Sequence, residues 1–252
     1  MAGKKVLIIA NWKMYPKSLQ GARKLLGGLG RISKKSHVEV ALAPPFPYLW
    51  EVARHKKFSL AAQDVFWESE GAFTGEVAPP MLKDLGVRYV IIGHSERRRL
   101  LGETDEMVNK KLKAVLGAGL RPIICIGEYK RDADGSFFSF LKDQVSKALS
   151  KVKKDYVSRI LFVYEPVWAI SPGKPALPGD AREAALFIRK TIAGLYGINI
   201  GKKVRILYGG SVDGRNAESF LRESDISGLL VGKESRDAEE FLKIVQCANH
   251  IS

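Results

Sequence analysis

Three side chains with the chemistry to move a proton each lie just beyond a short apolar run of the sequence: Lys13, His94 and Glu165. A carboxylate can remove a carbon-bound proton, while an imidazole and an ammonium can stabilise the negative charge that then develops on oxygen. Each also has an ordinary alternative, namely a solvated loop lysine, a histidine with a structural hydrogen bond and a glutamate with a buried partner. The local sequence leaves both interpretations open for each residue.

The neighbours of His94 and Glu165 bear on the charge of the two side chains. His94 is followed by Ser95 and Glu96, which suit the N-cap and the first turn of a helix. A helix N-terminus disfavours a cationic ring, so the imidazole is expected to be neutral. Glu165 has apolar neighbours in the segment 164–168, where the carboxylate either has a structural partner or acts as a base in a dry site.

Short apolar runs alternate with amphipathic stretches along the whole chain and predict an α/β fold. Several runs are apolar throughout, which is typical of strands buried on both faces of a parallel sheet. Eight strand–helix units in 252 residues favour a (β/α)8 barrel that forms a single domain over residues 1–252. The expected strands are 6–10, 38–42, 59–63, 89–92, 122–125, 160–164, 204–207 and 228–231.

A doubly wound open sheet is the alternative, because the same alternation of strands and helices fits both folds. The sequence has no glycine-rich dinucleotide-binding motif after its first strand, where such a sheet would need one. In a barrel the C-terminal ends of all strands meet around one mouth, so Lys13, His94 and Glu165 would lie together there.

Two glycine-bearing turns and one long connection complete the expected mouth. The turns 208–211 and 231–234 follow the seventh and eighth runs, where barrels frequently bind phosphate through backbone amides. The connection 168–176 is long for a strand–helix loop and lies beside Glu165, so we expect it to close as a lid. These features predict proton abstraction beside a carbonyl of a small phosphorylated substrate, without a metal or a cofactor.

The net charge is the unusual feature of the composition: 41 Lys and Arg against 27 Asp and Glu give +14. Such a charge favours an anionic partner, and a small anionic substrate is one candidate. The basic residues lie in scattered pairs without interleaved aromatic residues, so no nucleic-acid partner is expected.

No apolar run is long enough for a secretory signal or a membrane span, which predicts a cytoplasmic protein. Cys125 and Cys247 are expected to be buried, reduced thiols.

Segments spread over the whole chain match the motifs of one enzyme family in order. They are Asn11-Trp12-Lys13, Ala62-Gln63-Asp64, 71–76 (GAFTGE), 92–98 (IGHSERR), 125–128 (CIGE), 164–170 (YEPVWAI), 208–212 (YGGSV) and 230–232 (LVG). On these segments the chain resembles the triosephosphate isomerase family. The resemblance implies a TIM barrel that interconverts dihydroxyacetone phosphate and D-glyceraldehyde 3-phosphate.

The resemblance also implies a role for each matching residue. Glu165 would be the base that moves the proton, and His94 the neutral electrophile, a pairing for which this family is the standard example. Lys13 and Asn11 would contact substrate oxygens. The phosphate would be bound by backbone amides of Gly173, Ser211, Gly232 and Lys233.

Further residues would support the site or join two subunits. Trp168 and Glu128 would pair while the lid is open, and Tyr208 and Ser211 would latch the closed lid. The remaining supporting residues are Ser95, Glu96 and Cys125. Phe73, Thr74 and Gly75 lie in a loop that family members insert into a partner subunit, so a homodimer is implied.

Two segments depart from the family pattern. Residues 170–176 read ISPGKPA, where the family has Ile-Gly-Thr-Gly-Lys, a residue such as Thr, and Ala. Residues 232–236 read GKESR, where the family has Gly-Gly-Ala-Ser-Leu. These changes affect the lid and the phosphate turn and leave the residues of the reaction intact.

Two other functions compete with this interpretation. One is a different phosphate-handling barrel isomerase, against which Lys13, His94 and Glu165 together argue. The other is a catalytically impaired homologue whose charge serves binding to nucleic acid or to an acidic partner. Retention of every chemical residue argues against it.

Overall fold

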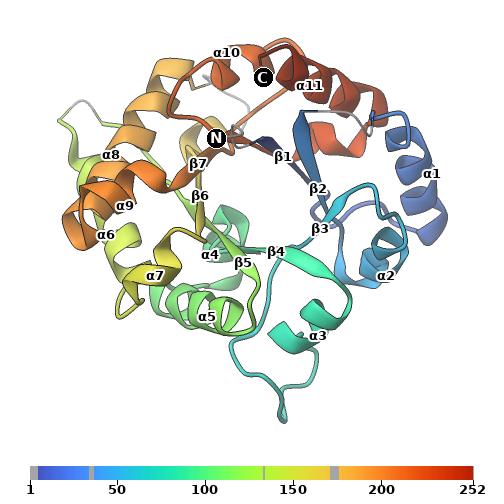
Figure 1. The fold of residues 1–252 in the computed structure, drawn as a ribbon, viewed down its shortest axis with the longest axis horizontal. Helices are drawn as coiled ribbons and strands as arrows, with labels where there is room; N and C mark the ends of the chain where they lie inside the picture. Colours follow the sequence, from blue (N-terminus) through green and yellow to red (C-terminus); the bar gives the residue numbers. More distant parts are fainter. Residues whose placement is uncertain (1–4, 34–36, 133, 171–175, 252) are drawn as a thin grey trace.

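Eight parallel strands form a closed barrel in which each strand pairs with the next and β8 pairs with β1 (Figure 1). The computed structural model describes residues 5–33, 37–132, 134–170 and 176–251. The strands are β1 (Val6–Asn11), β2 (Val38–Ala43), β3 (Ser59–Ala62), β4 (Val87–Ile92), β5 (Arg121–Ile126), β6 (Leu161–Tyr164), β7 (Arg205–Tyr208) and β8 (Gly228–Val231). Each expected strand is confirmed, with ends displaced by at most two residues, and the open-sheet alternative is wrong.

Helices surround the barrel and connect successive strands (Figure 1). They are α1 (Leu19–Leu29), α2 (Leu49–Ala53), α3 (Pro79–Asp84), α4 (Ser95–Leu101), α5 (Asp105–Gly117), α6 (Ser136–Ala148), α7 (Lys154–Val157), α8 (Pro178–Tyr196), α9 (Ile198–Lys203), α10 (Ala217–Leu221) and α11 (Ala238–Ile251). Three short 3-10 helices, η1 (Phe46–Tyr48), η2 (Val167–Ala169) and η3 (Lys233–Arg236), lie in the connections. Within the described residues, none of these helices is long and apolar enough to cross a bilayer.

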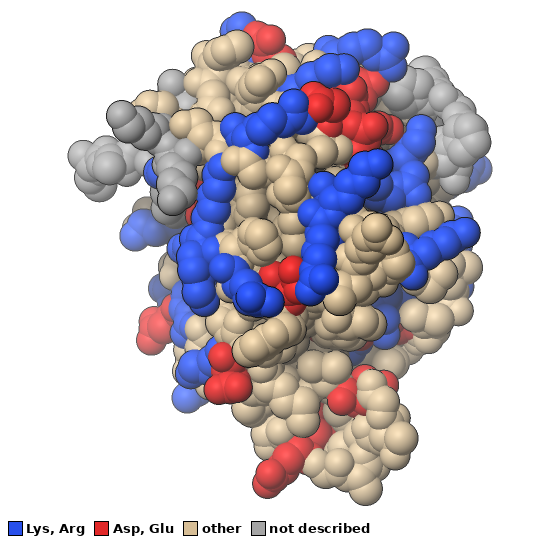
Figure 2. All heavy atoms as spheres, turned by 90° about the vertical axis from the view of Figure 1, so that its right-hand side faces the viewer, with Lys and Arg blue, Asp and Glu red and all other residues tan. Residues whose placement is uncertain are grey.

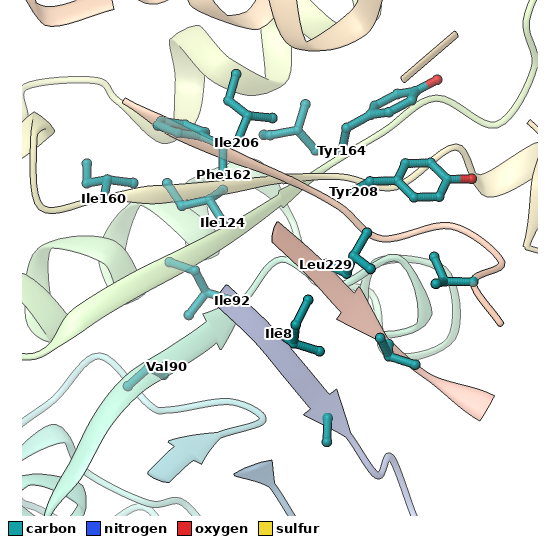
Figure 3. Close-up of a cluster of buried hydrophobic side chains, with 14 of the residues drawn as sticks. Ile8, Val90, Ile92, Ile124, Ile160, Phe162, Tyr164, Ile206, Tyr208 and Leu229 are labelled. Carbon is teal, nitrogen blue, oxygen red and sulfur yellow. The ribbon is translucent and has the colours of Figure 1, made fainter. Parts of the chain in front are cut away.

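The strands are apolar throughout because both of their faces are covered. Along β4, Val90 and Ile92 pack in the layer between the strands and the helices, where Figure 3 shows them with side chains from neighbouring strands. The alternate residues Tyr89 and Ile91 belong to a second cluster that fills the barrel. Side chains of a strand alternate between its faces, so one apolar run supplies both layers.

The two cysteines differ in environment. Cys125 is buried inside the barrel, as expected, whereas Cys247 on α11 is only half-buried. The expectation of two buried thiols is therefore wrong for Cys247, because the periodic apolar face of α11 turns neighbouring residues such as Val245 and Ala248 toward the core instead.

Candidate active site

Glu165 follows β6 and its carboxylate is buried. One carboxylate oxygen, Oε2, accepts a hydrogen bond from the backbone N–H of Ser95 at 3.0 Å. The other, Oε1, lies 3.1 Å from Nε2 of His94. The backbone N–H of Glu165 donates to Ile126 at the end of β5, at 2.8 Å. The first turn of α4 and the neighbouring strand thus fix this carboxylate at the barrel mouth.

His94 is the N-cap of α4, and its ring accepts a hydrogen bond from the helix. Nδ1 accepts from the backbone N–H of Glu96 at 3.2 Å. A nitrogen that accepts carries no proton, so this contact assigns the ring proton to Nε2, which faces Glu165. The expected helix start is confirmed, but the expected N-cap, Ser95, is wrong. The ring of His94 takes that place, while Ser95 is the first helical residue and donates its N–H to Glu165.

Lys13 lies just beyond β1 in a left-handed backbone conformation, with φ of 53°. Its N–H donates to the side chain of Asn11 at 3.1 Å, and its carbonyl accepts from Gln63 at 2.9 Å. Its ammonium contacts Glu96 at 2.6 Å. Burial raises the pKa of Glu96, but the hydrogen bond and charge of Lys13 outweigh it and lower that pKa overall. A charged carboxylate therefore holds the lysine in place at the mouth.

The two glycine-bearing turns and the three candidate catalytic side chains line one cavity of about 530 Å³. The hydroxyl of Ser235 anchors the second turn, because it donates to the carbonyls of Asn11 at 3.0 Å and Gly232 at 2.7 Å. A Cβ on Gly232 would lie 3.1 Å from Cε of Lys13, so the second turn and the side chain of Lys13 approach each other closely at this point. The cavity is lined by both turns together with Asn11, Lys13, His94 and Glu165.

The expected contact between Trp168 and Glu128 is present. Nε1 of Trp168 donates to Oε1 of Glu128 at 2.8 Å, and the hydroxyl of Tyr164 donates to the same oxygen at 2.7 Å. Burial raises the pKa of Glu128 even though these two donors lower it. The hydroxyl of Ser211 donates to the carbonyl of Ala169 at 3.0 Å. The remaining part of the expected lid, residues 171–175 including Gly173, lies outside the described residues.

Tyr208 and Cys125 are buried near the site and have different environments. The hydroxyl of Tyr208 has no hydrogen-bond partner within the described part of the chain, and burial raises its pKa. Cys125 lies behind Glu165, where burial and then the negative charge of Glu165 raise the pKa of the thiol well above its usual value. The thiol therefore stays protonated and is no nucleophile.

A buried ion cluster supports the connection between β4 and α4 that carries His94, and sequence reasoning missed this cluster. The ammonium of Lys111 on α5 contacts Asp64 at 2.7 Å and Glu103 at 2.8 Å, and Arg97 contacts both carboxylates. Glu103 also accepts the N–H of Gly93 at 2.8 Å. Burial raises the pKa of Asp64. Burial also acts to raise the pKa of Glu103, but the charges and hydrogen bonds of Lys111 and Arg97 together outweigh it and lower that pKa.

A signal for this cluster exists in the sequence. Lys111 shares the buried face of α5 with Val108, Leu112 and Val115, so a charged residue occupies an apolar period. A buried lysine needs an anionic partner, but the pattern does not say which carboxylate supplies it. Among the described residues, no group of three or more His, Cys, Asp or Glu side chains is arranged to hold a metal ion.

The closed barrel, with one polar cavity at the C-terminal ends of its strands, defines a TIM-barrel protein with the architecture of an enzyme. The family model of triosephosphate isomerase matches residues 6–248. A triosephosphate isomerase of Caldanaerobacter subterraneus subsp. tengcongensis is 48% identical over 243 residues, which cover 95% of this chain and 98% of that protein. Those of Carboxydothermus hydrogenoformans (44% over 247 residues, 96% and 98%) and Chloroflexus aurantiacus (46% over 246 residues, 95% and 97%) are also similar. The chain belongs to the triosephosphate isomerase family.

Replacing the buried lysine tests the ion cluster. Lys111→Met leaves Asp64 and Glu103 as under-compensated buried charges, so we expect the free energy of unfolding to fall by about 3–5 kcal/mol. Lys113→Met is the matched control, because Lys113 lies exposed on the same helix and contacts Asn109. Chemical denaturation at one protein concentration measures both. Equal stability of the two variants would contradict a supporting role for the cluster.

Proposed function

We propose that this chain interconverts dihydroxyacetone phosphate and D-glyceraldehyde 3-phosphate with Glu165 as the base. The observation that supports this most is the pairing of a buried carboxylate with a ring N–H, with 3.1 Å between Oε1 of Glu165 and Nε2 of His94. A proton acceptor and a donor for oxygen then lie side by side, as an enediolate reaction needs. Family membership over residues 6–248 points to the same reaction.

The reaction proceeds by two proton transfers at adjacent carbons. Glu165 removes a proton from C1 of dihydroxyacetone phosphate and returns it to C2. Between these steps negative charge lies on the substrate oxygens, where Nε2–H of His94 and the ammonium of Lys13 stabilise it. A hydroxyl proton moves from O1 to O2 through the His94 ring, so the atoms balance without a redox step, and we propose that neither a metal nor a cofactor takes part.

The phosphate group is held at the other end of the cavity. We assign it to backbone amides of Ser211, Gly232 and Lys233, which line the cavity, and to Gly173 in the lid on the strength of the family pattern. Asn11 and Lys13 complete the contacts to substrate oxygens. Contacts to this non-reacting group orient C1 and C2 against Glu165, which contributes to rate by positioning.

Closure of the lid would exchange one set of contacts for another. Trp168 is bound to Glu128, while the buried hydroxyl of Tyr208 has no partner within the described residues. In the proposed closed form Trp168 leaves Glu128, Tyr208 gains a partner in the lid, and Ser211 exchanges its present bond to the carbonyl of Ala169 for a contact that latches the lid. Closure removes water from Glu165 and strengthens the electrostatic contacts in the cavity.

A second copy of this chain is the proposed partner. The loop between β3 and α3 projects from the barrel (Figure 1), and in Figure 2 the same lower end displays acidic side chains among uncharged residues. It carries Phe73, Thr74 and Gly75, and Phe73 is 44% exposed although its ring packs on Phe66. We propose a homodimer in which this loop docks on the partner, without a membrane or nucleic-acid partner, in the cytoplasm.

A coupled assay on dihydroxyacetone phosphate tests the reaction. We expect the purified chain to turn over this substrate, and His94→Gln to lower kcat by about 10²–10⁴-fold with a small change in KM, because a positioned acid acts mainly in the transition state. A chain that binds phosphoglycolate but does not turn over would instead be the impaired homologue. Full activity of His94→Gln would remove the imidazole from the reaction.

Shortening the projecting loop across residues 71–76 tests the dimer. We expect monomers with greatly reduced activity and a retained fold, because the loop would no longer support the partner's Lys13 and His94. Sedimentation equilibrium measures the mass, and far-ultraviolet circular dichroism controls for folding. Phe73→Ala serves as the milder variant, with a dimer that dissociates at higher protein concentration. A wild-type monomer that is fully active at assay dilution would contradict the proposal.

A further inference from the structure

Two charged side chains lie at the phosphate end of the cavity, where the family pattern has Gly and Ala. Lys233 and Glu234 begin η3 and both line the cavity. Nζ of Lys233 lies 3.5 Å from Oε1 of Glu234, and the lysine side chain is 81% exposed against 27% for the glutamate. An exposed ion pair of this length is weak, so the ammonium can leave the carboxylate at little cost in free energy.

The backbone beneath this pair is fixed even though the lysine side chain is not. Ser235 is fully buried and its hydroxyl bonds to the carbonyls of Asn11 and Gly232. Its N–H also donates to Gly232, at 3.0 Å. The backbone of Lys233 is therefore held in one position by the turn. The flexible four-carbon side chain of the lysine still allows its ammonium to move.

The charges of the cavity leave Lys233 as the cation available to a phosphate group. Among the described residues that line the cavity, the basic side chains are Lys13 and Lys233. Lys13 contacts Glu96 at 2.6 Å, and the proposed reaction assigns its ammonium to the reacting oxygens of the substrate. Asp213 also lines the cavity, but Arg215 compensates it at 2.6 Å and lowers its pKa. Glu234 is therefore the acidic side chain that repels a dianion at this end of the cavity. Lys233 is the cation that offsets this repulsion.

We propose that the ammonium of Lys233 exchanges Glu234 for the phosphate group of the substrate, and so adds a side-chain cation to the backbone amides. The inference rests on the proposed function and deepens it, because it names a specificity group for a phosphate monoester dianion. Glu234 holds the lysine at the turn while the cavity is empty and competes with the ligand. The phosphate is bound alike in the ground and transition states, so the effect falls on KM rather than kcat.

A matched control separates this contact from the general charge of the protein. Lys and Arg side chains cover much of the surface in Figure 2, and loss of any one of them weakens the long-range attraction of an anion. Lys147 on α6 is 56% exposed and lies 3.8 Å from Asp105, so its ion pair is as loose as that of Lys233. It does not line the cavity, and Lys147→Gln removes the same charge from elsewhere.

The experiment compares four variants by steady-state kinetics and by calorimetric titration with phosphoglycolate. We expect Lys233→Gln to raise KM and the Kd of phosphoglycolate about five- to tenfold, since a charge-assisted contact is lost. Lys233→Arg should keep both values near those of the wild type. Glu234→Gln should lower both, because the competitor is removed, and Lys147→Gln should leave them near wild type.

Two outcomes would overturn the inference. Lys233→Gln with the same Kd as Lys147→Gln would show that the ammonium does not reach the phosphate. A fall in kcat with unchanged KM would place the effect outside phosphate binding. If the wild type binds phosphoglycolate without turning over substrate, the proposed function fails, whereas the titrations still decide the role of Lys233.

Discussion

The mouth of the barrel depends on the contact between the Glu165 carboxylate and the first turn of α4. The N–H of Ser95 and Nε2 of His94 hold the two carboxylate oxygens at 3.0 and 3.1 Å. The same turn supplies the N–H of Glu96 that leaves Nδ1 of His94 unprotonated. One helix start therefore orients the Glu165 carboxylate and leaves the ring proton of His94 on Nε2, which is the arrangement that the proposed reaction needs.

Packing elsewhere in the barrel makes this contact possible. A Cβ on Gly127 would lie 1.7 Å from the carbonyl oxygen of Glu165, so the segments that follow β5 and β6 can approach this closely only because residue 127 is glycine. On the other side, Glu103 accepts the N–H of Gly93 and is itself held by Lys111. Buried charge is costly unless it is paired, so the cluster is stable only as a whole. Both constraints fix the backbone at positions 93 and 165, and the side chains of His94 and Glu165 are positioned by that backbone.

Much of this arrangement is predictable from the sequence, because burial on both faces makes each strand an uninterrupted apolar run. The position of Lys13, His94 and Glu165 just beyond such runs then brings them to one mouth, which the cavity confirms. The pairing of Lys111 with Asp64 was not predictable, since residues 47 positions apart give no local signal of contact. The N-cap of α4 is a second feature that residue type does not predict. Serine is a favoured capping residue, but in the structure the ring of His94 accepts the helix N–H and makes His94 the N-cap.

Transfer of the carbon-bound proton by Glu165 is most directly measured by deuterium uptake from D2O. Proton nuclear magnetic resonance follows exchange at C1 of dihydroxyacetone phosphate during turnover. We expect the wild type to incorporate deuterium at C1 as the protonated carboxylate exchanges with solvent, and Glu165→Gln to lose this exchange by several orders of magnitude while it still binds phosphoglycolate. Exchange at the wild-type rate in Glu165→Gln would show that another group removes the proton.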